Sequence, residues 1–292
     1  MIIKGKEIKP NKLTKIGGEI PFYVMSSNNP GPTILLSGGL HGDEYNGIEI
    51  VKGIIRRGFK LNKGNLIMIP ILNNYGYKKG LRYDDSNLDI NRCFTRNSGN
   101  RVCRFLMDEI IPHIDYGIDF HTGGAKRTNY PQIRCSVGDT FQLDIAKKIN
   151  LPLIVNSKRV KGSFRNYCGK LGKPIFVFEG GYSRTTDREI IKQGIEKTLS
   201  FLSKEDIIDY RVTNTDDSVI LSKTKWIRNI TSGTFNTFYR EGDFVKGDTI
   251  IGEVIGKKGI KEFIRAKKDS IIIGMETNTS VVEDSALYHM GY

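Results

Sequence analysis

Two histidines and two glutamates stand where apolar, strand-like segments of the sequence end. His41 and Glu44 follow TILLSGGL, His121 follows YGIDF, and Glu179 follows KPIFVF. Two imidazoles and one carboxylate make a standard catalytic zinc set, because zinc then keeps one position open for water. The i, i+3 spacing lets His41 and Glu44 approach one ion from a single turn, and His121 would complete the site. These three residues are the predicted metal ligands.

The same residues suggest a hydrolytic reaction. Zinc lowers the pKa of its bound water to about 7 and polarises a carbonyl oxygen. Glu179 is the predicted general base, which would take a proton from the water and pass it to a leaving nitrogen. Asp119, two residues before His121, either supports the metal site from behind or faces the sheet. The sequence does not distinguish these two roles of Asp119.

Each feature also has a plainer structural interpretation when it is taken alone. An HxxE sequence occurs by chance in many turns, a histidine at a strand end can be buried and hydrogen-bonded, and a glutamate can cap a helix. Asn91 and Arg92, in NLDINRCF, could form a structural pair. His113 and His289 are interpreted as structural residues.

Strand-like and helix-like segments alternate through the first two thirds of the sequence. Apolar runs predict strands, and helical spacing fills the segments between them. The predicted strands are 33–37, 65–72, 116–120, 151–155 and 173–179, and the predicted helices are 44–57, 102–114, 142–149, 164–171 and 186–202. This alternation predicts an α/β fold class with a mixed central sheet flanked by helices, in which site residues gather at the carboxyl ends of strands.

The pattern changes after a polar segment near Val212 to Asp217. No helical period continues, and short β-rich runs alternate with turn signals such as REGD, VKGD and GKKG. The runs at 244–256 and 270–283 are interpreted as hairpins. We therefore predict a catalytic domain over residues 1–210 and a small, barrel-like all-β domain over residues 211–292.

Four motifs occur along the chain in a specific order: HGDE at 41–44, DINRCF at 89–94, DFHTGG at 119–124 and FVFEGG at 176–181. Together they resemble the succinylglutamate desuccinylase and aspartoacylase family, which belongs to the wider zinc carboxypeptidase fold group. The match spans roughly residues 30–185. The resemblance implies that His41, Glu44 and His121 bind zinc and that Glu179 is the catalytic glutamate.

The resemblance also implies contacts with a substrate. Asn91 and Arg92 occupy the positions at which the family binds the substrate carboxylate. Arg82 occupies the position of an arginine that polarises the scissile carbonyl, and Arg165, in KGSFRNY, corresponds to a further residue that contacts an anion. A guanidinium can hold a carboxylate bidentately, which a lysine ammonium cannot. An arginine aimed at a developing oxyanion lowers the barrier by about a few kcal/mol. A carboxylate-bearing substrate is therefore expected.

The β-rich tail resembles the C-terminal domain of the same family. Its segment GTFNTFYREGDFVKGDTIIGEVIG is also similar to biotin- and lipoyl-carrier domains. The hairpin that would carry the cofactor reads GMETN at 274–278, with glutamate where the carriers have lysine. The tail is therefore expected to be structural or to control access. The sequence has no clear counterpart for a C-terminal-domain tyrosine that aspartoacylases use, and Tyr182, Tyr239 and Tyr288 all stay open for that place.

Charge is unevenly spread along the chain. The net charge is +13, and residues 1–205 carry about +14 from 33 basic and 19 acidic side chains. Such a field favours an acidic ligand or a nucleic acid. However, the sequence has no helix-turn-helix signature, no RNP-like aromatic residues and no zinc-finger spacing, so no nucleic-acid partner is expected. Lysine-rich composition can also arise without a function.

Three other features of the sequence concern the cellular location of the protein. No apolar run of 18 residues is present, so no membrane span is expected. The start of the chain lacks the pattern of a signal peptide, and the four cysteines are scattered as in reduced proteins. The expected location is the cytoplasm.

The combined hypothesis is a zinc-dependent amidohydrolase, with one zinc ion per chain. It would act as a deacylase that cleaves the amide bond of an N-acyl amino acid or a related small carboxylate compound by metal-activated water. The alternative is a metallocarboxypeptidase acting on a peptide or peptidoglycan fragment. The acyl group, the amine portion and the formation of a homo-oligomer stay open.

Overall fold

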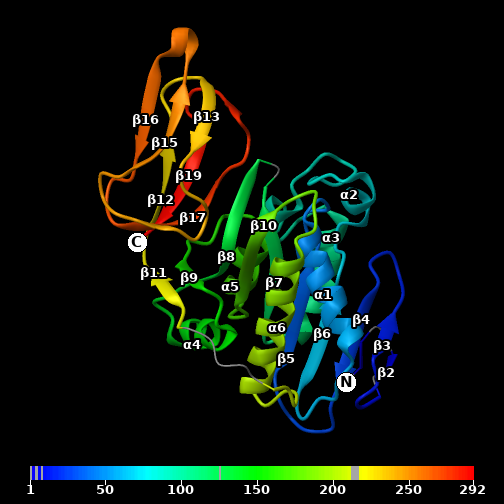
Figure 1. Cartoon of the computed structure of the whole chain (residues 1–292). Coiled ribbons are helices and arrows are strands. Elements are labelled where there is room, and N and C mark those ends of the chain that lie inside the picture. Colours follow the sequence, from blue (N-terminus) through cyan, green and yellow to red (C-terminus); the bar gives the residue numbers. More distant parts are fainter. Residues whose placement is uncertain (1, 4–5, 8, 125, 212–216) are drawn as a thin grey trace.

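The central feature of the fold is one large mixed sheet that runs through most of the molecule (Figure 1). The computed structural model describes all residues except 1, 4–5, 8, 125 and 212–216. The first part of the chain supplies the strands β3 (Thr14–Ile16), β4 (Phe22–Ser26), β5 (Thr33–Gly38), β6 (Asn65–Ile69), β7 (Tyr116–Gly123), β8 (Arg127–Cys135), β9 (Leu153–Asn156) and β10 (Ile175–Tyr182). A separate pair, β1 (Ile2–Ile3) and β2 (Lys6–Glu7), precedes them.

The order and direction of these strands explain how distant residues meet. Strands β6, β5, β7 and β10 are parallel neighbours, whereas β8 pairs antiparallel with β10 and parallel with β9. The carboxyl ends of β5, β7 and β10 therefore lie side by side at one edge. Polar residues that follow these three strands are brought together there, as expected for an α/β sheet.

Helices cover both faces of this sheet. They are α1 (Tyr45–Arg57), α2 (Asn74–Lys79), α3 (Arg101–Phe105), α4 (Thr140–Ile149), α5 (Phe164–Lys170) and α6 (Arg188–Lys204). In β5, Ile34 and Leu36 belong to one apolar core, and Leu35 between them belongs to the core on the other face. Successive side chains of a strand point to opposite faces, so a strand covered on both sides is apolar throughout.

One predicted helix is irregular. The segment predicted at 102–114 begins as α3, continues as a π-helical turn (Leu106–Ile110) and ends in a 3₁₀ turn (Ile111–His113). Pro112 lies in the last turn, and a proline has no N–H for a helical hydrogen bond. A further 3₁₀ turn, Ile90–Arg92, carries the DINR motif.

From residue 217 on, where every residue is described, the C-terminal part of the chain forms only strands and turns. Its strands are β11 (Val219–Leu221), β12 (Thr224–Arg228), β13 (Gly233–Thr237), β14 (Phe244–Val245), β15 (Ile250–Ile255), β16 (Lys261–Arg265), β17 (Ser270–Glu276), β18 (Ser280–Val281) and β19 (Ala286–Gly291), with a 3₁₀ turn at Lys257–Gly259. Strands β12, β19 and β17 continue the large sheet because β17 pairs antiparallel with β8. Strands β16, β15, β13 and β18 form a second sheet. The predicted fold class is confirmed.

The pairing of these strands differs from the sequence prediction. The segment 244–256 is no hairpin, because β14 pairs with β17 while β15 pairs with β13 and β16. The segment 270–283 is no hairpin either, because β17 pairs with β8, β14 and β19 and β18 pairs with β13. The GMETN segment begins inside β17, buried against β8, and is not a hairpin tip. Turn signals do not identify partners that lie far away in sequence.

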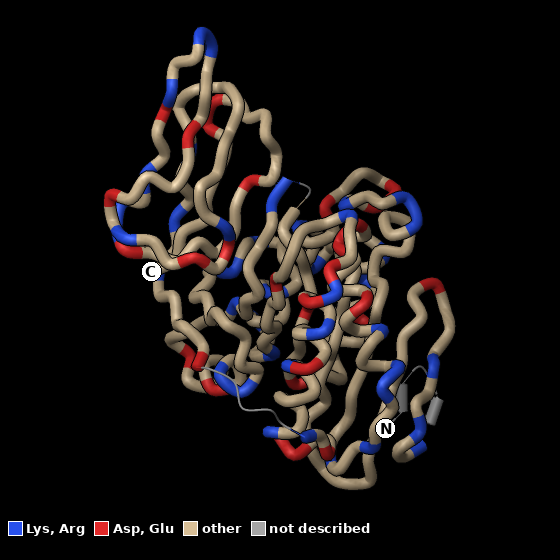
Figure 2. Tube along the Cα trace, in the orientation of Figure 1, with Lys and Arg blue, Asp and Glu red and all other residues tan. Residues whose placement is uncertain are grey.

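The boundary between the two parts stays a prediction. The expected division after residue 210 lies beside residues 212–216, which fall outside the described residues, as does most of the polar segment near Val212 to Asp217. Figure 2 shows Lys and Arg interspersed with Asp and Glu over both parts of the trace. Among the described residues, no helix combines the length and the apolar character needed to cross a bilayer.

Candidate active site

The HGDE segment forms a tight loop between β5 and α1. Glu44 stands immediately before α1, and its N–H donates to the carbonyl oxygen of His41. A Cβ on Gly42 would lie 2.1 Å from the main-chain carbon of Gly76, so α2 presses directly on this loop. Only glycine fits there, and the close contact fixes how His41 and Glu44 face the sheet.

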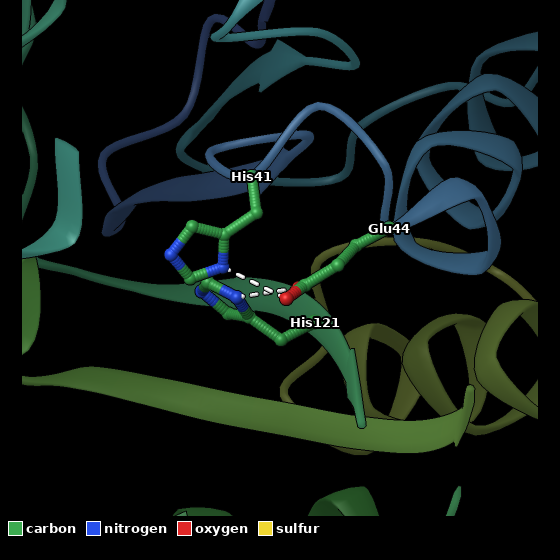
Figure 3. A group of neighbouring side chains, drawn as sticks. All are labelled: His41, Glu44 and His121. Atoms are coloured by element: carbon green, nitrogen blue, oxygen red, sulfur yellow. Dashed lines mark hydrogen bonds and ion pairs between the residues drawn. The ribbon is translucent and has the colours of Figure 1, made fainter. Parts of the chain in front are cut away.

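His41, Glu44 and His121 converge on one point (Figure 3). Nδ1 of His41 lies 2.8 Å from Oε1 of Glu44, and Nδ1 of His121 lies 2.8 Å from Oε2 of the same carboxylate. One ligand atom from each residue lies within 4.8 Å of the others, and all three side chains are buried. This group could hold a metal ion.

The protonation of Glu44 suits that role. Burial alone would raise the pKa of this carboxyl, but His41 and His121 outweigh the burial and hold its pKa well below the usual range. The carboxylate also accepts a hydrogen bond from the N–H of Thr122 at 3.1 Å. Glu44 is therefore ionised, the form in which a carboxylate binds a metal.

Each imidazole is held from behind by a second carboxylate. Nε2 of His121 lies 2.6 Å from Asp119, and Nε2 of His41 lies 3.1 Å from Asp89. A carboxylate on Nε2 fixes the ring orientation and leaves Nδ1 facing the centre, an arrangement found behind metal-binding histidines. Asp119 therefore supports the metal-binding group from behind, through His121. Asp89 was missed, although it begins the DINR motif.

Glu179 lies beside this cluster. It is the register partner of His121, on the neighbouring parallel strand β10. Asn129 donates to its Oε2 at 2.9 Å, and Nη1 of Arg134 lies 3.2 Å from its Oε1. Sequence reasoning missed Asn129 and Arg134 because it missed β8, a strand without an apolar run.

Arg82 and Arg165 differ in their partners. Arg82 pairs with Glu44 at 3.1 Å and with Asp89 at 3.0 Å, so it is tied to the metal-binding group. Arg165 is 7% exposed and donates to the carbonyl oxygen of Ser157, and it has no carboxylate partner among the described residues. Burial, with smaller contributions from nearby cations, lowers its pKa to about 10. A buried cation without a carboxylate needs an anion to offset its desolvation.

Asn91 and Arg92 belong to the 3₁₀ turn Ile90–Arg92, and Asn91 contacts the first residue of α5. Oδ1 of Asn91 accepts the N–H of Phe164 at 2.9 Å, and Arg92 donates to the main-chain oxygen of Asn91 at 2.7 Å. These contacts connect the DINR turn to the helix that carries Arg165. The structure thus places both motifs on one wall.

All eight residues singled out from the sequence line a single pocket of about 410 Å³: His41, Glu44, Arg82, Asn91, Arg92, His121, Arg165 and Glu179. The C-terminal part contributes Trp226 to the same pocket. The guanidinium carbon of Arg127 lies 4.7 Å from the centre of its ring, and His289 stacks on the ring at 4.5 Å. Trp226 and Arg127 were not anticipated, because neither stands in one of the four motifs.

Comparison with known proteins decides the family. The model of the succinylglutamate desuccinylase/aspartoacylase catalytic domain matches residues 30–204, more than half of the chain. The chain belongs to this family. Among curated proteins, it is 28% identical over 198 residues to the N-alpha-acetyl-L-2,4-diaminobutyric acid deacetylase of Halomonas elongata. That match covers 62% of this chain and 57% of the relative, so the chain spans little more than half of the relative's length.

Solved structures share the fold of this desuccinylase/aspartoacylase family member. The product-bound ectoine utilization protein EutE (DoeB) from Ruegeria pomeroyi has a TM-score of 0.82 and 19% identity, covering 93% of this chain and 88% of its own. A succinylglutamate desuccinylase/aspartoacylase from Rhodobacter sphaeroides has a TM-score of 0.82 and 22% identity, covering 94% and 90%. Both cover the C-terminal strands as well as the catalytic domain of the family.

None of the three tyrosines left open by the sequence lines the pocket of this family member. No tyrosine among the described residues lines it. Tyr288 is fully buried, and its hydroxyl lies 2.8 Å from Oγ1 of Thr237 and 2.7 Å from the main-chain oxygen of Ile251. Tyr182 is 46% exposed and lines a different hollow, and Tyr239 packs against the C-terminal core.

Proposed function

We propose that this chain is a zinc-dependent deacylase that hydrolyses the amide bond of an N-acyl amino acid or a related small carboxylate compound. The observation that carries the proposal is the convergence of His41 and His121 on Glu44, beside Glu179 and in one pocket with Arg165. Membership of the desuccinylase/aspartoacylase family supports the same reaction class.

The donor set fits zinc. Two imidazole nitrogens and one ionised carboxylate form a preferred set for this ion, and three protein ligands leave a position for water or substrate. The Nε2 atoms of both imidazoles are engaged by Asp89 and Asp119, so their Nδ1 atoms are the ones presented to an ion. When bound, one zinc per chain would supply Lewis-acid polarisation of the carbonyl and a lower pKa for water.

Glu179 is the proposed general base and acid. Asn129 and Arg134 hold its carboxylate from one side, and the register with His121 directs it toward the metal-binding group. From there it would accept a proton from the attacking water and deliver that proton to the leaving nitrogen. Its two partners keep the carboxylate oriented through both transfers.

The cationic wall of the pocket is proposed to hold the substrate carboxylate. Arg165 has no carboxylate partner among the described residues, and Arg92 lies with it in the pocket. The Nδ2 donor of Asn91 also makes no hydrogen bond with a described residue, which leaves it free for an acceptor on the substrate. Arg82, next to Glu44, is proposed to polarise the scissile carbonyl.

The size of the pocket favours a small substrate over a peptide. Its volume is about 410 Å³, and Trp226 from the C-terminal part bounds it. The relative from Halomonas elongata is named as a deacetylase of an N-acetylated amino acid, which is a compound of this size class. We infer the class of substrate from these two observations and leave the acyl group open.

The test combines metal analysis with amine release from a panel of N-acyl amino acids. About one zinc per chain is expected in the wild type and in Glu179→Gln, with turnover in the variant lower by about 10² to 10⁴. Glu283→Gln, which changes an exposed glutamate, is the matched control and should leave turnover unchanged. A zinc-free preparation with full turnover would contradict the mechanism. Zinc without turnover of any small amide would instead favour peptide substrates.

A further inference from the structure

A second hollow, which we call the annex, lies beside the proposed active site. It has a volume of about 1100 Å³. One wall comes from the end of β9 and from α5, and the other from residues 222–224 and from β19 with the chain end that follows it. The annex and the active-site pocket share the lining residues Arg134, Ser157 and Lys158, so the two hollows adjoin.

The charged side chains that line the annex are all basic. Arg134, Lys158, Arg159, Lys170 and Lys223 all contribute, and among the described lining residues there is no aspartate or glutamate. Apart from Arg134, none of the five forms an ion pair with a described residue. Cations gathered in a concave site raise the local concentration of anions.

Local contacts position one of these residues on each wall, Arg159 through its side chain and Lys223 through its main chain. A Cβ on Gly169 would lie 2.1 Å from Nη1 of Arg159, so this guanidinium rests directly on α5. On the opposite wall, the N–H and carbonyl oxygen of Lys223 both bond to the main chain of Tyr292 at 3.0 Å. The annex therefore has walls from both parts of the chain.

Arg134 connects the annex with the proposed general base. Its Nη1 lies 3.2 Å from Glu179, its Nε donates to Gln132 at 3.2 Å, and its Nη2 makes no hydrogen bond with a described residue. Trp226 lines the active-site pocket and His289 lines the annex, and their rings stack 4.5 Å apart with an angle of 8°. The stacked pair thus stands between the two hollows.

We propose that the annex is a second anion-binding site, for a small molecule with several carboxylate or phosphate groups, and that Arg134 couples this site to Glu179. An anion that engages Arg134 competes with Oε1 of Glu179 for the same guanidinium. The site goes beyond the proposed deacylase activity, and its occupancy can be measured without turnover, so either proposal can fail alone.

The binding test uses the full chain and two probes, inorganic phosphate and tricarballylate. Trp226 is the one tryptophan of the sequence, and it stacks on an annex residue, so its fluorescence reports occupancy. We expect saturable binding in the wild type and a Kd about tenfold higher or more in Lys170→Glu/Lys223→Glu. The matched control Lys225→Glu reverses an exposed lysine outside the annex and should change the Kd less than about twofold. The tighter probe identifies the anionic group.

Two results would contradict the proposal that the annex binds an anion. Binding that is unchanged in the double variant but lost in Arg165→Ala would place the anion in the active-site pocket. A wild-type titration that never saturates would leave no specific site in the annex.

The coupling has its own test. Glu179→Gln releases Arg134 from a charged competitor, so this variant should bind the tighter probe about threefold more strongly than the wild type. An unchanged Kd in Glu179→Gln would refute the coupling while leaving the annex site intact.

Discussion

At the residue scale, the proposed metal site depends on paired carboxylates as much as on its ligands. Asp119 and Asp89 each engage the Nε2 atom of one histidine. Ser37 donates to the other oxygen of Asp119 at 2.7 Å, so this carboxylate is itself held in place. Ser37 of β5 therefore orients Asp119, and Asp119 in turn orients His121.

Replacing Asp119 should weaken the metal site without removing a ligand. In Asp119→Asn the side chain keeps its shape but loses the charge that orients and polarises His121. We expect a zinc affinity lower by about 10- to 100-fold, measured by competition with a chelator. Asp108→Asn, at an exposed helical position, should bind zinc as the wild type does. Equal affinity in both variants would show that His121 needs no support from Asp119.

At the element scale, β17 positions the proposed general base although it contributes no residue to the pocket. Gly274 of β17 is the register partner of Asn129 in β8. A Cβ on Gly274 would lie 2.3 Å from Oδ1 of Asn129 and 2.6 Å from the main-chain oxygen of Thr128. Because Asn129 in turn holds Glu179, the close approach of the two strands supports the proposed chemistry.

Gly274→Ala should therefore lower turnover and leave metal binding intact. The added methyl group has to displace Asn129 or separate the strands, which moves Glu179 but not the elements that carry His41, Glu44 and His121. We expect kcat to fall by about 10- to 100-fold, as for a misplacement of about 1 Å. Gly138→Ala places its methyl group in open space and serves as the control. Normal kcat in Gly274→Ala, with zinc still bound, would contradict this role for β17.

At the scale of the whole molecule, a buried histidine makes stability depend on pH. His289 lies at the seam between the two parts, and its Nδ1 has no hydrogen-bond partner among the described residues. Burial, together with Arg134 and Arg127, lowers its pKa from 6.5 to about 3. Between these two values the unfolded chain binds a proton that the folded chain does not, so stability falls as the pH drops.

The size of that effect can be measured by urea unfolding. The contribution of His289 is fully present above pH 6.5 and is lost as the pH falls toward 3, with a slope of about 1.4 kcal/mol per pH unit. His289→Phe keeps a ring against Trp226 but cannot be protonated. The loss of unfolding free energy between pH 7 and pH 5 should therefore be smaller in the variant than in the wild type. An equal loss in both proteins would assign the pH dependence to other groups.

The central strands that sequence reasoning found share one property, which is that apolar side chains are buried on both faces. Strands β5, β7 and β10 are covered on both faces, so they appear in the sequence as apolar runs. Strand β8 was missed because it contains Pro131 and turns Asn129 and Arg134 toward the pocket. The register shift between Glu179 and Gly181, where β10 pairs with β8, breaks the alternation further.

The sequence by itself determined the residues that can perform the chemistry: HGDE, DFHTGG and FVFEGG combine residue types and spacings that are specific enough to indicate a zinc-type site. Tertiary structure alone decided which groups orient them. Asp89 contacts His41, Arg134 contacts Glu179, and Trp226 lines the pocket, although these residues lie far apart in the sequence. A ligand motif is local, because one turn or one strand end presents it. The partners of those ligands depend on which strands pair and in which register, and no short stretch of sequence encodes that.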